Sequence, residues 1–360
     1  MYTFWVSNRK TINRIVEFMK LDQGPKKTVI EAWAGAGTVT NALVRHPSVE
    51  KVIALEDSTF YGSWLKRLPE DSPGFDSSKL IHLPLSGFKW ETYTSIYHQG
   101  ALDHLSEDLK IPRSHHDADW QADSPLVFFA HLPNSVHGEL LFAQLTAAIA
   151  TRSWLFQLGR VKLCFVCSES MVRRILSQPG DTTNRSKIGT IAQCMTDIEW
   201  HIPGHELLPF KDHVYPPTGI IGLRLTLGSS YGIPNENVAT GVGKQALSFV
   251  TLEPKKQPLV EREVFEAMDY LMRKLYVLKA KPVHEALKTA APGANDILKR
   301  LSKENPELAR DEDETIDPST PVYCLTNKQW VALARAFEIW PFRPQILIEE
   351  GLLPDVERKV

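Results

Sequence analysis

The hydrophobic pattern of the chain alternates between short continuous apolar runs and stretches with helical spacing. The apolar runs predict buried strands at residues 28–33, 52–56, 80–85, 125–130 and 161–166. Helical spacing between them predicts helices at residues 39–45, 61–68, 140–150 and 170–176. Strands that alternate with helices indicate a parallel sheet with right-handed crossovers, so the predicted fold class is α/β.

The start of the chain predicts one more helix, over residues 8–19. Ile12, Ile15, Val16 and Met19 recur at the spacing of one helix face. The first 16 residues hold three basic residues and no acid, which is also typical of a targeting segment. The amphipathic spacing favours a structural helix that leads almost directly into the first strand.

After residue 256 the strand pattern stops. Helical spacing over residues 262–278, 296–303 and 328–339 predicts a separate group of helices. We therefore expect an α/β domain over residues 1–255 and a helical C-terminal domain over residues 256–360.

Three further segments stand outside the alternation. Residues 97–124 and 228–245 have the composition of connectors, and residues 219–227 predict a late strand. The first connector contains His115, His116 and Asp117, but an irregular insertion makes a loop a better interpretation than a metal site.

Composition narrows the classes of function. With 43% hydrophobic and 23% charged residues in 360, the chain is neither disordered nor fibrous. No apolar run reaches the roughly 20 residues that span a bilayer, so we expect no membrane partner. A net charge of −2 means that a nucleic acid would have to meet a local basic patch.

The four cysteines do not predict a disulfide framework or a metal site. Cys164 and Cys167 have the Cys-x-x-Cys spacing, but no second pair would complete a zinc site. They lie in an apolar strand whose alternation turns them to opposite faces, so buried thiols are the better interpretation. Four cysteines in a chain of this length indicate a reducing compartment.

Glycines follow the first strand, where a nucleotide-type fold brings its backbone close to a cofactor. The loop contains Gly35 and Gly37, and Glu56 closes the next strand, 19 residues after Gly37. A carboxylate at about this spacing accepts hydrogen bonds from ribose hydroxyls in such folds. A tight strand-to-helix turn beside an exposed acid is the alternative interpretation.

At this point the sequence resembles a known family, the rRNA adenine-N6 dimethyltransferases. The resemblance rests on the order of motifs along nearly the whole chain, at residues 8–16, 31–40, 54–57, 130–134, 174–180 and 213–217. Residues 153–163, 178–187 and 338–344 are similar to one branch of that family, the fungal mitochondrial transcription factors, which act as specificity subunits of the mitochondrial RNA polymerase.

The resemblance implies a Rossmann-like class I fold that binds S-adenosylmethionine, followed by a helical C-terminal domain. It implies that the cofactor positions of the family fall on the following residues: Val6, Trp33, Gly35, Gly37, Glu56, Ser86 and His131.

Several of these positions depart from the family pattern. Trp33 stands at the first glycine of the family's Gly-Pro-Gly-x-Gly loop, and Ser86 aligns with an acid that binds the adenine amino group. The Asn-Leu-Pro-Tyr tetrad, which holds the target amine and stacks on the flipped base, is replaced by His131, Leu132, Pro133 and Asn134. We therefore expect no confident catalytic residue and a cofactor site that is filled or weak.

Nucleic-acid binding is better supported than catalysis. Residues 271–303 hold eight basic residues against two acidic ones, a stripe that can track phosphates, although a solvated helix face is the alternative. The predicted phosphate contacts are Arg173, Arg174, Arg185, Lys187, Lys279, Lys281, Lys299 and Arg300. Phe88, Trp90 and Tyr93 follow the third strand and are candidates for stacking on unpaired bases, with core packing as the alternative.

The leading hypothesis for function follows from the resemblance. It is promoter recognition and melting for a single-subunit mitochondrial RNA polymerase in the mitochondrial matrix, with promoter DNA as the other partner and no cofactor required. Two alternatives stay open: an active methyltransferase that uses S-adenosylmethionine on adenines of mitochondrial rRNA, and an assembly factor that binds rRNA without catalysis.

Overall fold

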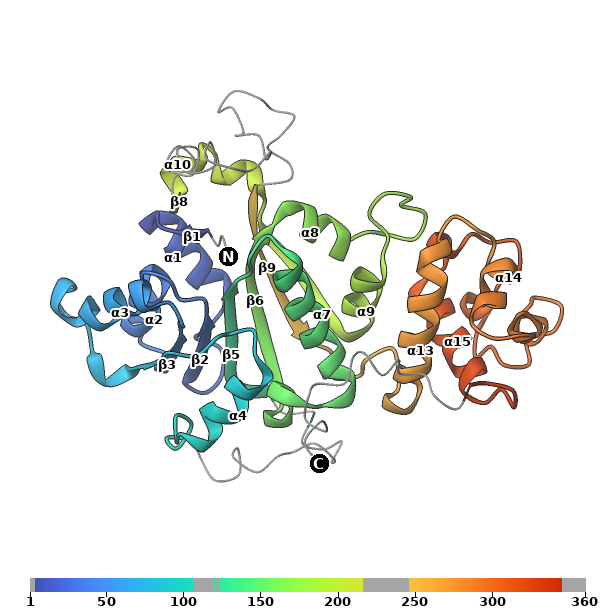
Figure 1. The fold of residues 1–360 in the computed structure, drawn as a ribbon, viewed down its shortest axis with the longest axis horizontal. Helices are drawn as coiled ribbons and strands as arrows, with labels where there is room; N and C mark the ends of the chain where they lie inside the picture. Colours follow the sequence, from blue (N-terminus) through green and yellow to red (C-terminus); the bar gives the residue numbers. More distant parts are fainter. Residues whose placement is uncertain (1–3, 106–119, 121–122, 216–245, 345–360) are drawn as a thin grey trace. The chain divides into compact units, whose positions relative to one another are not determined.

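A computed structural model describes residues 4–105, 120, 123–215 and 246–344 (Figure 1). The chain divides into two compact units, the first formed by residues 1–173 and 196–256 and the second by residues 174–195 and 257–360. The predicted strand at 219–227, the connector at 228–245 and the His115–His116–Asp117 cluster lie outside the described residues. Within the described part, no helix is long and apolar enough to cross a membrane.

The first unit is built on one sheet, in which seven strands are described. Their order is β4-β3-β2-β5-β6-β9-β7, with parallel pairing from β4 to β6 and antiparallel pairing at β9 and β7. The strands are β2 (Lys27–Ala32), β3 (Val49–Leu55), β4 (Leu80–Leu83), β5 (Asp123–His131), β6 (Arg160–Ser168), β7 (Thr196–Ile202) and β9 (Leu247–Pro254). The predicted α/β class is confirmed, and the antiparallel pair is an addition that the alternation did not predict.

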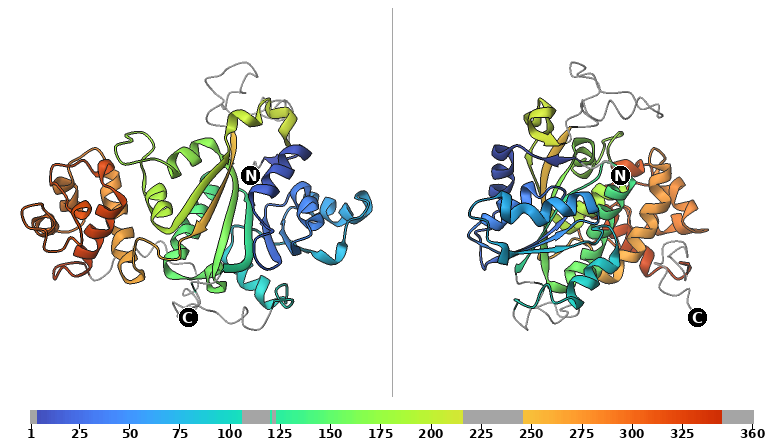
Figure 2. Two further views of the ribbon diagram at one scale, coloured as in Figure 1. Left: turned by 180° about the vertical axis from the view of Figure 1, so that it is seen from behind. Right: turned by 60° about the vertical axis from the view of Figure 1, so that its left-hand side comes forward.

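Helices cover both faces of this sheet, as Figures 1 and 2 show. On one face α1 (Arg9–Phe18) and α2 (Thr38–Arg45) pack on Val29, Val127 and Cys164. On the other, α4 (Trp90–His98) and α7 (Val136–Thr151) bring Tyr93 and Phe142 against Phe128 and Phe165, with ring centroids 5.5–6.2 Å apart. Strands buried on both faces explain why the parallel strands have continuous apolar runs.

Three more helices complete the first unit at its edges. Helix α3 (Thr59–Asp71) follows β3, α8 (Glu169–Ile175) follows β6 and α10 (Phe210–His213) precedes β8. Ser58 caps α3 by accepting a hydrogen bond from the amide of Tyr61, and Asn8 caps α1 in the same way through the amides of Lys10 and Thr11.

A two-stranded ribbon holds the start of the chain. Strand β1 (Trp5–Val6) pairs antiparallel with β8 (Val214–Tyr215), and the amide of Ser7 donates to the carbonyl of His213. The N-terminal segment is therefore fixed by residues more than two hundred positions away.

The second unit is helical. It contains α9 (Lys187–Met195), α13 (Arg262–Leu275), α14 (Val283–Ala286) and α15 (Asn327–Glu338), with short 3-10 turns between them. Stacked rings join its elements: Tyr276 on Trp330 at 5.2 Å and Tyr270 on Phe337 at 5.8 Å. Segment 174–195 packs with these helices, and the Thr190 hydroxyl lies 2.6 Å from that of Tyr276.

Arg185 holds this segment to α15, which corrects its predicted role as a phosphate contact. Its side chain is buried, with a residue exposure of 1%. The guanidinium donates to the carbonyl of Ser177 and the amide oxygen of Gln193, at 2.9 and 3.0 Å, and to the amide oxygen of Asn327 at 2.7 Å. A buried cation whose two terminal nitrogens donate to neutral oxygens supports the fold and cannot reach a phosphate.

We expect Arg185→Ala to destabilise the protein by about 3 kcal/mol or more, because it removes the donor to Asn327 Oδ1 and to the Leu325 carbonyl and leaves a buried cavity. Denaturant unfolding of the full chain measures this. The matched control is Arg300→Ala, which breaks an exposed ion pair with Glu307 and should leave the stability almost unchanged. If Arg185→Ala leaves the stability unchanged and weakens DNA binding, Arg185 is a phosphate contact on the surface after all.

Candidate functional site

The loops at the carboxyl ends of β2, β3, β4 and β5 carry the predicted cofactor positions. In a parallel sheet these ends meet at one edge, where ligands of doubly wound folds bind. Trp33, Gly35 and Gly37 follow β2, Glu56 follows β3, Ser86 follows β4, and His131 is the last residue of β5.

The glycine loop and Glu56 form one hydrogen-bonded unit. Gly35 and Gly37 have φ angles of +59° and +78°, a region that favours glycine. The Gly35 amide donates to Oε2 of Glu56 at 2.8 Å, and the Ser58 amide donates to Oε1 at 3.0 Å. Burial raises the pKa of the Glu56 carboxyl, and the two amides oppose that rise.

The indole of Trp5 lies directly against this loop. A Cβ built on Gly35 would stand 2.4 Å from Nε1 of Trp5. The indole N–H donates to the carbonyl of Trp33 at 2.7 Å, and the ring packs on Tyr61 with centroids 4.6 Å apart. Trp33 is the large ring that the sequence predicts in this loop, and Trp5, which the sequence does not single out, is a second one.

Trp33 is itself buried, with 8% of its surface exposed and a φ of +54°. A Cβ built on Gly87 would lie 3.8 Å from its ring, so the indole points toward the loop after β4. There Ser86 accepts a hydrogen bond from Thr92 through its carbonyl and supplies no carboxylate. Trp33 thus stands where the family pattern has a glycine and points toward the loop where that pattern has an acid. Trp5 packs on the glycine loop itself.

His131 takes the first position of the tetrad that the family pattern places after β5. The amide of Val6 donates to its Nε2 at 3.3 Å, and 1% of the residue is exposed. Burial lowers the pKa of the imidazole to about 3, so the ring is neutral. Because Nε2 accepts, the proton sits on Nδ1, a buried atom with no hydrogen-bond partner among the described residues.

The rest of the tetrad has little freedom. Gly138 at the start of α7 packs on Pro133, so close that a Cβ would stand 2.1 Å from the Pro133 carbonyl oxygen. That carbonyl accepts the amide of Ser135 at 2.8 Å. Asn134 is exposed at the position of the family's aromatic ring.

The three predicted stacking residues separate in the structure. Tyr93 is buried, and its hydroxyl donates to the carbonyl of Gly87 at 2.6 Å, so the prediction that it stacks on bases is wrong. Trp90 is half-buried on Trp154, with centroids 4.1 Å apart, and Phe88 is half-buried against the edge of His137. Trp154 was not predicted, although its φ of +60° marks an unusual backbone for a large residue.

The predicted phosphate contacts are mostly members of ion pairs. Arg173 in the first unit pairs with Glu169, and Lys187 in the second pairs with Asp269 at 2.6 Å. Arg174 is half-buried, and Lys279 donates to the carbonyls of Thr183 and Arg185. Lys281, Lys299 and Arg300 are exposed and pair with Glu285, Asp296 and Glu307.

Two other predictions on the site concern metals and thiols. Cys164 and Cys167 are fully buried, as the strand pattern indicated, and burial raises the pKa of both thiols to about 12. Among the described residues, no group of His, Cys, Asp or Glu could hold a metal ion.

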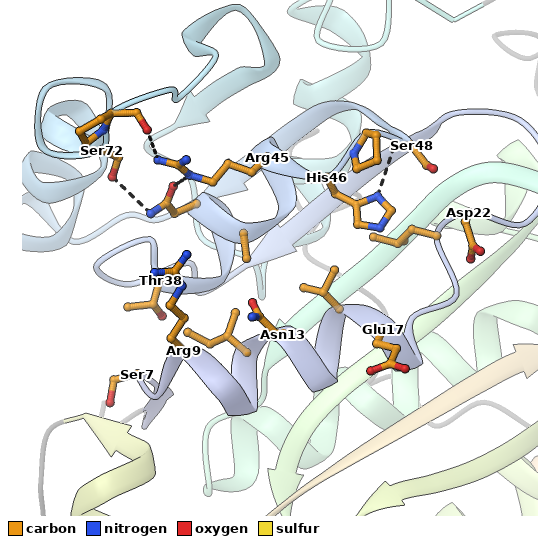
Figure 3. Close-up of a pocket in the computed structure, with 17 residues that line it drawn as sticks. Ser7, Arg9, Asn13, Glu17, Asp22, Thr38, Arg45, His46, Ser48 and Ser72 are labelled. Atoms are coloured by element: carbon orange, nitrogen blue, oxygen red, sulfur yellow. Dashed lines mark hydrogen bonds between the residues drawn. The ribbon is translucent and has the colours of Figure 1, made fainter.

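A groove also lies between α1 and α2, with Ser7 and Thr38 at the end nearest Val6 (Figure 3). Its volume is about 1120 Å³, and Ile12 and Val16 line it together with the charged residues Arg9, Arg45, Glu17 and Asp22. None of the sequence-predicted cofactor or nucleic-acid residues lines it.

Glu31 of β2 is a buried carboxylic acid behind the loop. Burial raises its pKa to about 8, while the hydroxyl of Thr40, which donates at 2.7 Å, opposes the rise. Between pH 4.5, the ordinary pKa, and pH 8 the folded state holds a proton that the unfolded state has lost. Stability therefore falls as pH rises through this window.

We expect the stability of the Glu31→Gln variant to fall less steeply with pH than that of the wild type, because a glutamine has no proton to release. The wild-type slope is steeper by up to about 1.4 kcal/mol per pH unit. Urea unfolding of both proteins from pH 5 to 8 measures the difference. Glu70→Gln, at an exposed carboxylate of α3, should follow the wild type; a Glu31→Gln slope equal to the wild type would contradict the assignment.

The sequence of this chain is similar to known proteins of one family. The ribosomal RNA adenine dimethylase profile matches residues 3–314. "Dimethyladenosine transferase 1, mitochondrial" of Vermamoeba vermiformis is 21% identical over 340 residues, 89% of this chain and 84% of that protein. "Mitochondrial transcription factor 1" of Lachancea kluyveri is 23% identical over 268 residues, 73% and 68% of the two chains.

Another transcription factor and a solved structure are also similar. "Mitochondrial transcription factor 1" of Saccharomyces cerevisiae is 22% identical over 278 residues, 76% of this chain and 71% of that protein. The structure of a putative sarcosine dimethylglycine methyltransferase from Galdieria sulphuraria has a TM-score of 0.35 at 11% identity, covering 69% and 86% of the chains. With most of its length matched by one profile, this chain belongs to the ribosomal RNA adenine dimethylase family and has the class I methyltransferase fold.

Proposed function

We propose that this protein is a mitochondrial transcription initiation factor that uses a methyltransferase fold to bind promoter DNA. In this role it joins the mitochondrial RNA polymerase in the matrix and helps to open the promoter, without a cofactor. The observation that carries the proposal is the altered tetrad, since the position that should hold the target amine cannot accept a hydrogen bond from it. Relatives named mitochondrial transcription factor 1 support the transcription role.

The target amine and the free nitrogen of His131 are both hydrogen-bond donors. An adenine amine approaches with N–H groups and needs acceptors. The only lone pair of neutral His131 already accepts the amide of Val6, which leaves Nδ1–H, a donor. Asn134 cannot stack on a flipped base as an aromatic ring does. The residues present therefore do not fit the family's methyl transfer.

Binding to DNA would use the exposed cations and the half-buried rings. Ion pairs such as Lys281–Glu285 and Lys299–Asp296 are exposed and contribute little stability, so a phosphate can replace the carboxylate at small cost. Phe88 and Trp90 supply rings for unpaired bases of the opened strand.

The second candidate function is an active rRNA adenine-N6 dimethyltransferase. One observation favours it: Glu56 keeps its place at the end of β3, bonded to the glycine loop. The similar Vermamoeba protein carries that name.

Calorimetry with S-adenosylmethionine separates the two functions. We expect no saturable heat at micromolar concentrations for the wild type and no methylation of an adenine-containing rRNA hairpin. Micromolar binding together with transfer of a labelled methyl group would replace the transcription proposal with the enzyme.

Run-off transcription with the polymerase tests the melting role. We expect a Phe88→Ala, Trp90→Ala variant to transcribe poorly from a linear promoter and to recover on a template with a pre-formed bubble. Each lost stack costs roughly 1–3 kcal/mol only after the strands separate, so the open population should fall about tenfold or more.

Two controls make this result specific. Trp64→Ala removes an exposed ring of α3 and should transcribe normally on both templates. Tyr93→Ala removes a core ring and should lower the melting temperature and impair both templates equally. If the double variant behaves like Tyr93→Ala, its rings are core and the melting role lies elsewhere.

A further inference from the structure

The N-terminal strap, Trp5 and Val6, makes three hydrogen bonds to the loops and strand end that carry the predicted cofactor positions. The Trp5 indole donates to the carbonyl of Trp33 at 2.7 Å, and the Val6 amide donates to His131 at 3.3 Å. The carbonyl of Val6 accepts the hydroxyl of Thr38 at 2.7 Å. Pairing of β1 with β8 fixes the strap from its other side.

The Trp5 ring takes the place that a cofactor needs. Glycine at position 35 leaves its Cα bare, which lets another group approach the backbone closely. That group is Trp5, whose Nε1, Cε2 and Cδ1 stand 2.4–2.7 Å from the position of a Cβ on Gly35. The ring is 7% exposed, and Tyr61 covers it at 4.6 Å. A dissolved ligand cannot occupy the same space without displacing the indole.

We propose that the strap is an internal occupant of the cofactor site, and that a nucleoside-binding site persists beneath Trp5. This goes beyond the proposed function, which requires only that the chain does not transfer methyl groups. The protein excludes S-adenosylmethionine because its own tryptophan is bound there, and the groups below the ring are retained.

Glu56 is the group that would recognise the nucleoside. Each of its oxygens accepts one backbone amide, and each carboxylate oxygen has a second lone pair. These lone pairs can accept the two neighbouring hydroxyls of a ribose. Ligands expected at the emptied site are therefore ribonucleosides, for which adenosine is the probe.

The strap competes with any free ligand because it is tethered. A group held by a short chain segment acts at an effective concentration in the millimolar range. In this protein α1 holds the chain just after Val6, and β8 pairs with the strap along its side. A dissolved nucleoside has to compete with this tethered ring, and removal of the ring should uncover the site.

The test is a gain of binding on removal of the ring. Calorimetry on the full chain compares wild type, Trp5→Gly and Trp5→Ala, with adenosine and 2′,3′-dideoxyadenosine as probes. We expect no saturable binding to the wild type and saturable adenosine binding to both variants. Loss of the hydroxyls should weaken binding by about tenfold or more.

Matched variants control for the loss of a tryptophan. Trp64→Gly removes a ring that is 53% exposed and leaves no cavity, so it should gain nothing. Trp330→Gly empties a fully buried site in the second unit that lacks Glu56, and it should gain indole binding without adenosine binding. If Trp5→Gly folds poorly, Trp5→Val keeps part of the packing, and added indole should raise the melting temperature of Trp5→Gly.

The outcomes separate this proposal from the transcription role. A folded Trp5 variant that binds adenosine no better than wild type or Trp64→Gly overturns the internal occupant, and so does equal binding of the dideoxy probe. Neither result bears on transcription. Saturable binding of S-adenosylmethionine to the wild type without methyl transfer overturns the internal occupant alone, whereas methyl transfer in addition overturns the proposed function as well.

Discussion

The hydrogen bond from the Gly35 amide to the Glu56 carboxylate is the contact on which the candidate site depends. It ties the loop after β2 to the end of β3, and it holds Gly35 in the left-handed conformation that turns its bare Cα toward the N-terminal strap. Trp5 rests on that surface, and its indole N–H fixes Trp33 in turn. Val6, next in the chain, then reaches His131 and fixes the tautomer of the ring. One backbone-to-carboxylate contact thus connects all the loops in which this chain departs from the family pattern.

Much of the fold was predictable because burial leaves a simple pattern. Strands β2, β5 and β6 are covered on both faces, so their sequences are continuous apolar runs of the kind that sequence analysis detects. Strand β7 is an edge strand in which exposed and buried residues are mixed, and it gave no such run. Helix α9 was not predicted, and seven of its nine residues are buried.

The site itself was harder to predict, because its unusual residues act through distant contacts. Trp5 lies in a two-residue strand, too short for any periodicity, and its partners are 28 and more positions away. The sequence predicts a surface position for Arg185 because arginines are rarely fully buried. Only the fold brings its acceptors, Gln193 and Asn327 of α15, next to it. Residues 271–303 have an excess of positive charge because two of their acidic partners lie outside this range. Asp269 pairs with Arg273, and Glu307 pairs with Arg300.

The order of strands also sets when this sheet can close during synthesis or import. Strand β9 lies between β6 and β7 although it follows both in the chain. Until residues 247–254 are available, β6 keeps an open hydrogen-bonding edge and β7 has no partner in the sheet. A chain that emerges from a ribosome or a translocation channel with its N-terminus first therefore exposes the open edge of β6 while residues 169–246 follow it. Such an edge invites pairing with other chains, so this architecture makes early protection by a chaperone valuable.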